Sequence, residues 1–329
     1  MKRFATTLDY IGDDRWSSQA TIIPPSKTAP EELLSFFRVL HAAYTHPVLV
    51  LDSSSGHFHP DILVAALIGL LPRRKRPKII ISGCMWQRDK GLRGKFQEII
   101  ARLADRVVDF YAVQSSEELT LMPDTWRVDA AKIRLCPYFA TIKPNDITAP
   151  LPDETGYIFA GGDAHRNYDL LVEAARQMPN TRFIVASSRL NGAANLPANV
   201  QAGRVSHSEF MSLMRGATAV VTPLLHHGMT RAAGQQTYLN AMWLGIPSIV
   251  TAAHGVRDHI VDGQNGFIID STTQSLLDRL HWVLNPNNAQ QLEQINTAAK
   301  KIVREQFTFT HHVTRLLEIV DEAHNRPTP

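Results

Sequence analysis

Short apolar runs alternate with amphipathic stretches along almost the whole chain, and this alternation most strongly constrains the fold. The apolar runs have the length and the flanking turn residues of buried strands, as in 47–55, 78–83 and 157–162. Between them, segments such as 30–44 and 168–178 carry apolar residues at helical spacing. Parallel strands need crossover connections, which helices provide. The sequence therefore predicts an α/β protein built from doubly wound parallel sheets.

The alternation is interrupted at residues 141–156, which contain three prolines and no apolar periodicity. A chain of 329 residues is long enough for about two domains. We therefore expect a linker here, between a Rossmann-like domain over residues 1–150 and a second over 151–306. A helix over 307–329 is expected to cross back to the first domain. The first strand that the sequence indicates is 20–24, with no clear strand before it.

Composition excludes several classes of protein. Basic and acidic residues nearly balance, with 34 Lys and Arg against 31 Asp and Glu, so the chain lacks the charge of a dedicated nucleic-acid-binding protein. Cys84 and Cys136 are too few for a disulfide framework or a cysteine-rich zinc site. The longest apolar stretch, 62–71, is far shorter than the ~20 residues of a membrane span. With no signal peptide visible, we expect a soluble cytoplasmic protein.

Four stretches of the second half then follow one another in a recognisable order. YIFAGGDAHRNYDLLVEA reads as a strand, a glycine turn, a basic residue and a helix, and VQAGRVSHSEFMSLMRGATAVVTPL as a strand, a helix and a strand. AAGQQTYLNAMWLGIPSIVTAAHGV reads as a helix opened by Gly234 and a strand, and VRDHIVDGQNGFIID closes the series. Together they resemble the nucleotide-sugar domain of family-4-like GT-B glycosyltransferases, the glycosyl transferases group 1. The resemblance covers roughly residues 156–325.

The resemblance implies a fold, a reaction and its ligands. The fold would be GT-B, with two Rossmann-like domains facing a cleft: an abbreviated acceptor-side domain and a nucleotide-sugar-binding domain. The reaction would move a sugar from a nucleoside-diphosphate sugar to a glycan, a lipid-linked saccharide or a small molecule, with retention of configuration. The resemblance implies no metal and no cofactor besides this donor, and a place in polysaccharide or glycan biosynthesis.

A sugar donor carries a diphosphate, which needs backbone N–H groups and positive charge. Gly161 and Gly162 allow the backbone to approach a phosphate closely, and Arg166 can reach the same oxygens. Gly234 opens a helix whose N-terminal N–H groups attract anions. The expected diphosphate-binding residues are Gly161, Gly162, Arg166, Arg231, Gly234, Gln235, Gln236 and Thr237. By the same resemblance, the nucleoside would contact Arg204, Val205 and Asn240.

The chain departs from the family's Glu-X7-Glu pattern, whose positions correspond here to Ala232 and Asn240. An asparagine can accept one hydrogen bond from a ribose, but it cannot hold two hydroxyls as a carboxylate does. Two alternatives therefore stay open. One is a non-catalytic subunit that binds nucleotide sugars or acts as a scaffold. The other is a different GT-B enzyme, such as a nucleotide-sugar epimerase.

Candidate catalytic residues of the first half lie in and after the expected strand 47–55. His57 and His59 follow it and Asp52 lies in it; each could exchange a proton with the acceptor. Capping and loop packing are alternative roles for the histidines. A metal site would need ligands that converge in space, which this spacing does not guarantee.

Five basic charges fall within six residues at 73–78. Such a run is typical of a solvated loop. Next to the apolar helix predicted at 60–71, Arg73, Arg74, Lys75 and Arg76 could also contact anionic lipid, which would make the protein peripheral on the inner face of the cell membrane. The run lacks the interleaved aromatic residues typical of nucleic-acid binding, so no nucleic-acid partner is expected.

Overall fold

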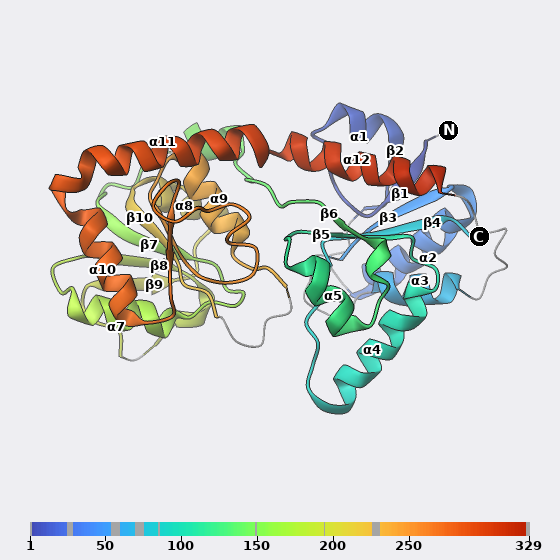
Figure 1. Ribbon diagram of the computed structural model, residues 1–329, viewed down its shortest axis with the longest axis horizontal. Coiled ribbons are helices and arrows are strands. Elements are labelled where there is room, and N and C mark those ends of the chain that lie inside the picture. The colour runs from blue at the N-terminus through green and yellow to red at the C-terminus, as the bar shows by residue number, and fades with distance from the viewer. Residues whose placement is uncertain are drawn as a thin grey trace. The chain divides into compact units, whose positions relative to one another are not determined.

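The structure is a computed structural model of the whole chain. It describes residues 2–24, 29–53, 60–69, 76–84, 86–148, 150–193, 195–225 and 231–326. By its contacts the chain divides into two compact units, residues 1–137 with 310–329, and residues 138–309 (Figure 1). Each unit contains one six-stranded sheet whose strand pairs are all parallel. The predicted α/β class with two doubly wound sheets is therefore confirmed.

The sheet of the first unit has the order β2-β1-β3-β4-β5-β6. Its strands are β1 (Phe4–Thr6), β2 (Ala20–Ile22), β3 (Val48–Asp52), β4 (Lys78–Ser82), β5 (Phe110–Val113) and β6 (Ile133–Leu135). Its helices are α1 (Asp14–Gln19), α2 (Ala29–Thr45), α3 (Pro60–Ile68), α4 (Gly91–Asp105), α5 (Glu118–Trp126) and α12 (Phe309–Asn325). β1 corrects the expectation of no strand before residue 20. It has only three residues, too few to show a pattern, yet it pairs with both β2 and β3.

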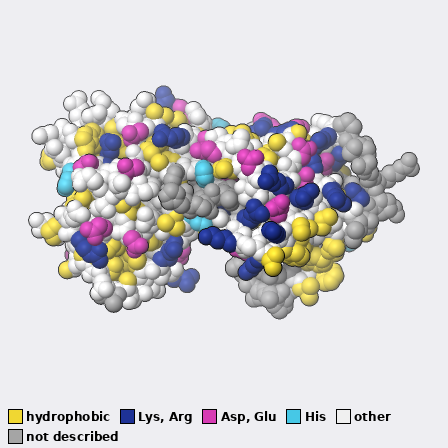
Figure 2. Space-filling view, turned by 60° about the horizontal axis from the view of Figure 1, so that its bottom comes forward, with side chains coloured by type: hydrophobic (Ala, Val, Ile, Leu, Met, Phe, Trp, Pro, Cys, Tyr) yellow, Lys and Arg dark blue, Asp and Glu magenta, His cyan; other side chains and the backbone are white. Residues whose placement is uncertain are grey.

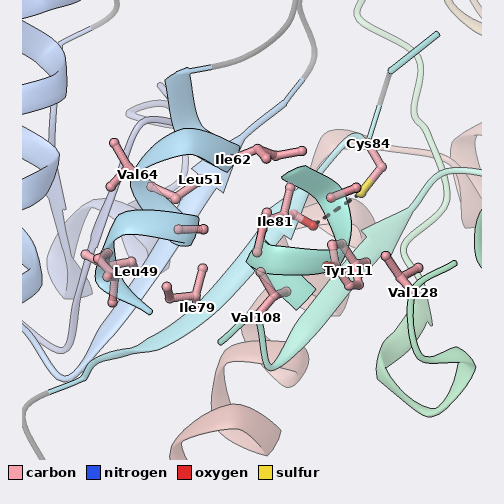
Figure 3. Close-up of a cluster of buried hydrophobic side chains, with 14 of the residues drawn as sticks. Leu49, Leu51, Ile62, Val64, Ile79, Ile81, Cys84, Val108, Tyr111 and Val128 are labelled. Carbon is pink, nitrogen blue, oxygen red and sulfur yellow. Dashed lines mark hydrogen bonds between the residues drawn. The ribbon is translucent and has the colours of Figure 1, made fainter. Parts of the chain in front are cut away.

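The core of this unit lies between the sheet and helices α2 to α5 (Figure 3). Leu49 and Leu51 of β3 and Ile79 and Ile81 of β4 are fully buried on this face. Their neighbours in the strands are buried as well, which is typical of a parallel sheet covered on both sides. This explains why these strands appear in the sequence as continuous apolar runs.

Helix α12 belongs to the first unit although it ends the chain. The Arg134 Nε donates to the Glu322 carboxylate at 2.9 Å, and the Arg326 guanidinium lies over the Phe110 ring. Near the start of the helix, Tyr10 hydrogen-bonds His312 at 3.1 Å. These contacts attach α12 and the residue after it to the loop between β1 and α1 and to β5 and β6.

The sheet of the second unit has the order β12-β11-β10-β7-β8-β9. Its strands are β7 (Tyr157–Gly161), β8 (Phe183–Ala186), β9 (Val200–Gly203), β10 (Ala217–Thr222), β11 (Ser248–Thr251) and β12 (Phe267–Ile269). Its helices are α6 (Pro144–Thr148), α7 (Tyr168–Gln177), α8 (His207–Arg215), α9 (Gln235–Leu244), α10 (Thr273–Leu284) and α11 (Ala289–Gln306). Alternate residues of β7 enter two different clusters, one with α7 and α10 and one with α8, so both faces of the sheet are covered.

Residues 138–156, which include the segment expected as a linker, group with the second unit instead. Asp146 of α6 lies 3.0 Å from the His207 ring, and the Ser212 hydroxyl donates to the Pro150 carbonyl. Side-chain contacts therefore hold a segment whose prolines indicated only an irregular connection. The two units divide after Pro137, earlier than the expected boundary at residue 150. Among the described helices, none is long and apolar enough to cross a membrane.

Candidate anion-binding site

Several candidate residues of the second unit meet at the carboxyl ends of neighbouring strands. β7 ends at Gly161, β8 at Ala186, β9 at Gly203 and β10 at Thr222, and these four strands are adjacent in the sheet. The turn after β7 and the start of α9, which follows β10, come together here through the side chain of Arg166. Ligands of parallel α/β sheets bind at this edge.

Arg166 is a buried cation that the structure holds with neutral oxygens. Its side chain donates to the Gly161 carbonyl at 3.1 Å, the Ala164 carbonyl at 2.7 Å and the Thr237 hydroxyl at 3.1 Å. The residue is only 6% exposed, and none of the ion pairs in the described part of the chain includes it. Burial lowers the pKa of its guanidinium. A desolvated cation without a paired carboxylate favours an anion beside it.

Gly162 and Gly234 make room for this guanidinium. Gly162 has φ +96°, and a Cβ at this position would lie 2.8 Å from the Arg166 Nη2. Gly234 has φ +75°, and its Cβ would lie 2.8 Å from Leu224 and 2.9 Å from Thr222. Both positions need glycine for conformation and for space. Gly161 is needed for a different reason, since a Cβ at this position would overlap the Phe210 ring.

Helix α9 begins directly beside Arg166. Gly234 is its N-cap residue, and the Gly234 carbonyl accepts from the N–H of Thr237. Gln235 and Thr237 are buried in the first turn, and Thr237 contacts Arg166 as described above. The Gln236 side chain donates to the Thr141 hydroxyl at 3.0 Å. The N-terminal N–H groups of such a helix and its dipole favour negative charge at this point.

His165 is a residue of this site that the sequence did not single out. Its φ is +54°, rare for a residue with a side chain, and its Nε2 lies 3.2 Å from the Arg231 Nη2. Burial, followed by the charges of Arg231, Arg166 and Arg189, lowers the pKa of the His165 imidazole. A neutral ring can therefore accept from Arg231. The only signal in the sequence was its place between the glycine turn and Arg166.

A second hydrogen-bonded group joins the ends of β7 and β8. The Asp163 carboxylate accepts from the Ser187 hydroxyl at 2.6 Å and from the Ser188 N–H and hydroxyl, and these hydrogen bonds lower its pKa. Arg204, after β9, is exposed, and its charge also lowers the pKa of Asp163. The structure thus places Arg204 near the same turn. Val205 is partly buried against the cluster of α8.

Asn240 lies deeper on α9 than the other candidates and is 2% exposed. Its Oδ1 accepts from the Thr141 N–H at 2.8 Å, and its Nδ2 lies 3.1 Å from the Thr141 Oγ1. Both polar atoms of the side chain are therefore engaged by one residue. The structure gives Asn240 a structural contact, while its contact with a ribose stays a prediction. Ala232 is buried at the other position of the family's glutamate pair.

The candidates of the first unit are only partly described. His57 and His59 lie outside the described residues. Asp52 ends β3, and its N–H donates to the Thr7 hydroxyl at 2.7 Å. The catalytic roles of all three residues stay predictions. Within the described ranges, no group of three or more His, Cys, Asp or Glu side chains could hold a metal ion.

Comparison with known proteins gives this geometry a family. Residues 157–302 match the family described as Glycosyl transferases group 1. The matched range begins at β7 and contains every candidate residue of the second unit. This part of the chain is similar to a group 1 glycosyltransferase domain. The resemblance seen in the sequence is thus confirmed.

Relatives and solved structures agree with this assignment. Over 85 residues, the chain is 32% identical to trehalose synthase from Pyrococcus horikoshii, a match that covers 26% of this chain and 20% of that protein. Sucrose-phosphate synthase from Thermosynechococcus elongatus has a similar fold, with a TM-score of 0.67, 14% identity, and coverage of 92% of this chain and 82% of that one. HepE from Anabaena, solved with UDP, gives a TM-score of 0.65 at 14% identity, with coverage of 92% and 86%. These structures show that the fold is GT-B.

Proposed function

We propose that this chain transfers a sugar from a nucleoside-diphosphate sugar to an acceptor hydroxyl. The observation that carries the proposal is Arg166, a buried guanidinium without an ion pair among the described residues, placed at the N-terminus of α9. The leaving group of such a reaction is a nucleoside diphosphate, whose oxygens would complete the surroundings of this cation. The family of the domain agrees with this chemistry.

Stabilisation of the departing diphosphate would then supply much of the rate. Arg166 and the first N–H groups of α9 would donate hydrogen bonds to its oxygens, and Gly161, Gly162 and Gly234 would let the backbone approach. Arginine and helix dipole together can replace a divalent cation in this role, so we propose a metal-independent reaction. Retention of anomeric configuration is proposed from the family alone.

A uridine nucleotide is the first donor to test. HepE, which shares the fold, was solved with UDP and with UDP-glucose. For the acceptor, we propose that Asp52, His57 or His59 exchanges a proton with its hydroxyl. The chain spans only a fifth of the trehalose synthases that it matches, so their acceptor is not carried over.

A non-catalytic nucleotide-binding subunit is the second candidate function. The observation that favours it is the pair Ala232 and Asn240, which leaves the site without either family carboxylate. Both candidates predict nucleotide binding. They differ in turnover, because only a transferase releases nucleoside diphosphate from a nucleotide sugar when an acceptor or water is present.

Calorimetric titration with UDP in the presence of EDTA tests the proposed site. We expect Arg166→Ala to weaken binding by roughly tenfold or more, since a hydrogen bond to a charged group contributes about 1.5–3 kcal/mol. Arg176→Ala is a matched control, because Arg176 lies on the same unit, is exposed and pairs only with Glu173 among the described ion pairs. Equal affinity of the Arg166 variant and the wild-type protein would contradict the proposed site.

We further propose that the protein works in the cytoplasm, at the inner face of the cell membrane. The support for it is the basic run of the sequence, of which Arg73, Arg74 and Lys75 lie outside the described residues. Arg76 is described, and its guanidinium donates to the Gly69 carbonyl after α3.

A further inference from the structure

Helix α4 presents an apolar stripe on the side that faces away from its core. Its exposed apolar residues are Leu92 at 84%, Phe96 at 61%, Ile99 at 54% and Leu103 at 41% exposure. They are spaced by four, three and four residues, so they form one continuous line along the helix. The buried residues Ile100, Ala101 and Ala104 face the core of the unit instead. Burial within the fold therefore does not explain the stripe.

The stripe continues across the neighbouring helix into a groove. Helix α3 packs against α4 and exposes Leu63 and Leu67. Between α2, α3 and α4 lies a groove of about 920 Å³, whose lining includes Phe36, Leu63, Leu67 and Leu103. Arg76 and Arg106 also line it. Figure 2 shows hydrophobic side chains gathered on this part of the molecule, next to a band of Lys and Arg side chains. A contiguous exposed apolar patch of this kind marks an interaction site.

The charged residues of α4 that belong to none of the described ion pairs are both exposed and positive. Lys95 and Arg102 border the stripe by their positions on the helix, and both residues are exposed. Neither takes part in an ion pair in the described part of the chain. The acidic residues in and beside the helix are all paired with cations: Asp89 with Arg93, Glu98 with Arg88, and Asp105 with Lys132. The surface beside the stripe is therefore positive.

We propose that this face, which we call the α4 face (Leu92, Phe96, Ile99 and Leu103 with Lys95 and Arg102), binds the surface of an anionic phospholipid bilayer. A helix with an apolar stripe bordered by Lys and Arg lies in the plane of the interface, with its apolar side chains among the acyl chains and its cations at the phosphates. The positive charge of the α4 face favours an anionic bilayer over a second copy of the chain, because two copies would bring like charges together.

The α4 face shares no residue with the basic run 73–78 or with the candidate site of the second unit, although Arg76 of that run lines the adjoining groove. The inference therefore does not depend on glycosyl transfer. It holds equally if the chain binds nucleotides without turning them over, and its test uses no substrate.

Flotation with lipid vesicles tests the proposal on the full chain. At low salt, we expect the protein to float with vesicles that contain phosphatidylglycerol, and not with vesicles of phosphatidylcholine alone. The double substitution Phe96→Ser with Ile99→Ser should lower the bound fraction by roughly tenfold or more. Ile11→Ser is the control, because Ile11 is 61% exposed, as Phe96 is, but lies between β1 and α1.

The charges are tested with a matched pair of variants. Lys95→Gln with Arg102→Gln should weaken binding, whereas Lys301→Gln with Arg257→Gln removes the same net charge from exposed positions of the second unit and should leave binding unchanged. Equal effects of the two pairs would mean that overall charge alone attracts the protein, which would overturn the proposal.

Two further measurements address insertion and self-association. In a Phe96→Trp variant, the new tryptophan should shift its emission to the blue when anionic vesicles are added, and an unchanged spectrum would contradict insertion. Light scattering should give the mass of a monomer. A dimer that the Phe96→Ser and Ile99→Ser changes dissociate would assign the α4 face to a second copy of the chain and overturn the proposal.

Discussion

At the scale of single residues, the candidate site depends on small spaces around one buried guanidinium. Arg166 replaces the hydration of its charge with two backbone carbonyls and the Thr237 hydroxyl. Such an arrangement costs stability in the free protein, because no carboxylate forms an ion pair with this cation among the described residues. A bound diphosphate would neutralise the guanidinium. Binding should therefore raise the unfolding free energy of the second unit by removing this cost as well as by adding contacts.

Gly162 allows this space to be tested separately from backbone conformation. Gly162→Ala introduces a Cβ 2.8 Å from the Arg166 Nη2, whereas Gly156→Ala places its Cβ in open space at a similar φ, +88° against +96°. We expect both variants to lose about 1–2 kcal/mol of unfolding free energy, because alanine is strained at positive φ. Only Gly162→Ala should also weaken UDP binding, by roughly tenfold, because the guanidinium must move. Thermal unfolding and calorimetric titration of the pair provide the measurements. Equal affinities of Gly162→Ala and Gly156→Ala for UDP would show that UDP binding does not depend on the position of the Arg166 guanidinium.

At the scale of elements, α9 has two roles in the second unit. Its first turn faces the candidate anion site, and its middle holds Thr141 through Asn240. The segment before α6 is thus fixed on the same helix that would bind the diphosphate.

Asn240→Ala tests which role this residue has. Its loss leaves the Thr141 N–H without its acceptor, so we expect the unfolding free energy to fall by about 1–3 kcal/mol. Thr141→Val keeps the N–H that donates to Asn240 and removes only the hydroxyl, so its loss should be smaller, and a less than additive loss in the double variant would assign the effect to this pair. The predicted ribose contact adds a ligand test: UDP binding should weaken by about 0.5–1.5 kcal/mol and pyrophosphate binding should not change. Equal losses for both ligands would mean that Asn240 shapes the helix and does not contact the ribose.

Sequence patterns predicted strands and turns better than contacts between individual side chains. The strands β3, β4 and β7 and the glycine turn before α7 were clear, because buried strands and positive-φ turns demand particular residue types. β1 was missed because three residues carry no periodicity. The partner of Asn240 was missed because Thr141 lies 99 residues away, and His165 because its role depends on a contact with Arg231. Such pairs are decided by packing, which a single sequence does not encode locally.

At the scale of the whole molecule, the chain leaves the first unit after Pro137 and returns to it at Thr310. The returning helix α12 contributes His312, which is buried beside that first exit. Its Nδ1 lies 2.8 Å from the Pro137 carbonyl and 3.5 Å from the Cys136 Sγ, while its Nε2 lies 3.1 Å from the Tyr10 hydroxyl. A neutral ring can donate at one nitrogen and accept at the other. His312 therefore joins the two ends of the first unit, and its burial favours the uncharged ring.

This preference for the neutral ring predicts that acid weakens the attachment of α12 to the first unit. Burial lowers the pKa of His312 from 6.5 to about 4. A lowered pKa in the folded state means that the unfolded chain binds the proton first, so the contribution is complete above pH 6.5 and is lost as the pH falls toward 4. At about 1.4 kcal/mol per pKa unit, the loss amounts to about 3 kcal/mol. We expect His312→Gln to reduce stability at neutral pH and to flatten its dependence between these two pH values, as measured by denaturant unfolding followed at several pH values. His259, also buried with a lowered pKa, lies in the second unit and remains in both proteins, so it cancels from the difference between them. An unchanged pH dependence in the variant would mean that protonation of His312 does not weaken the first unit.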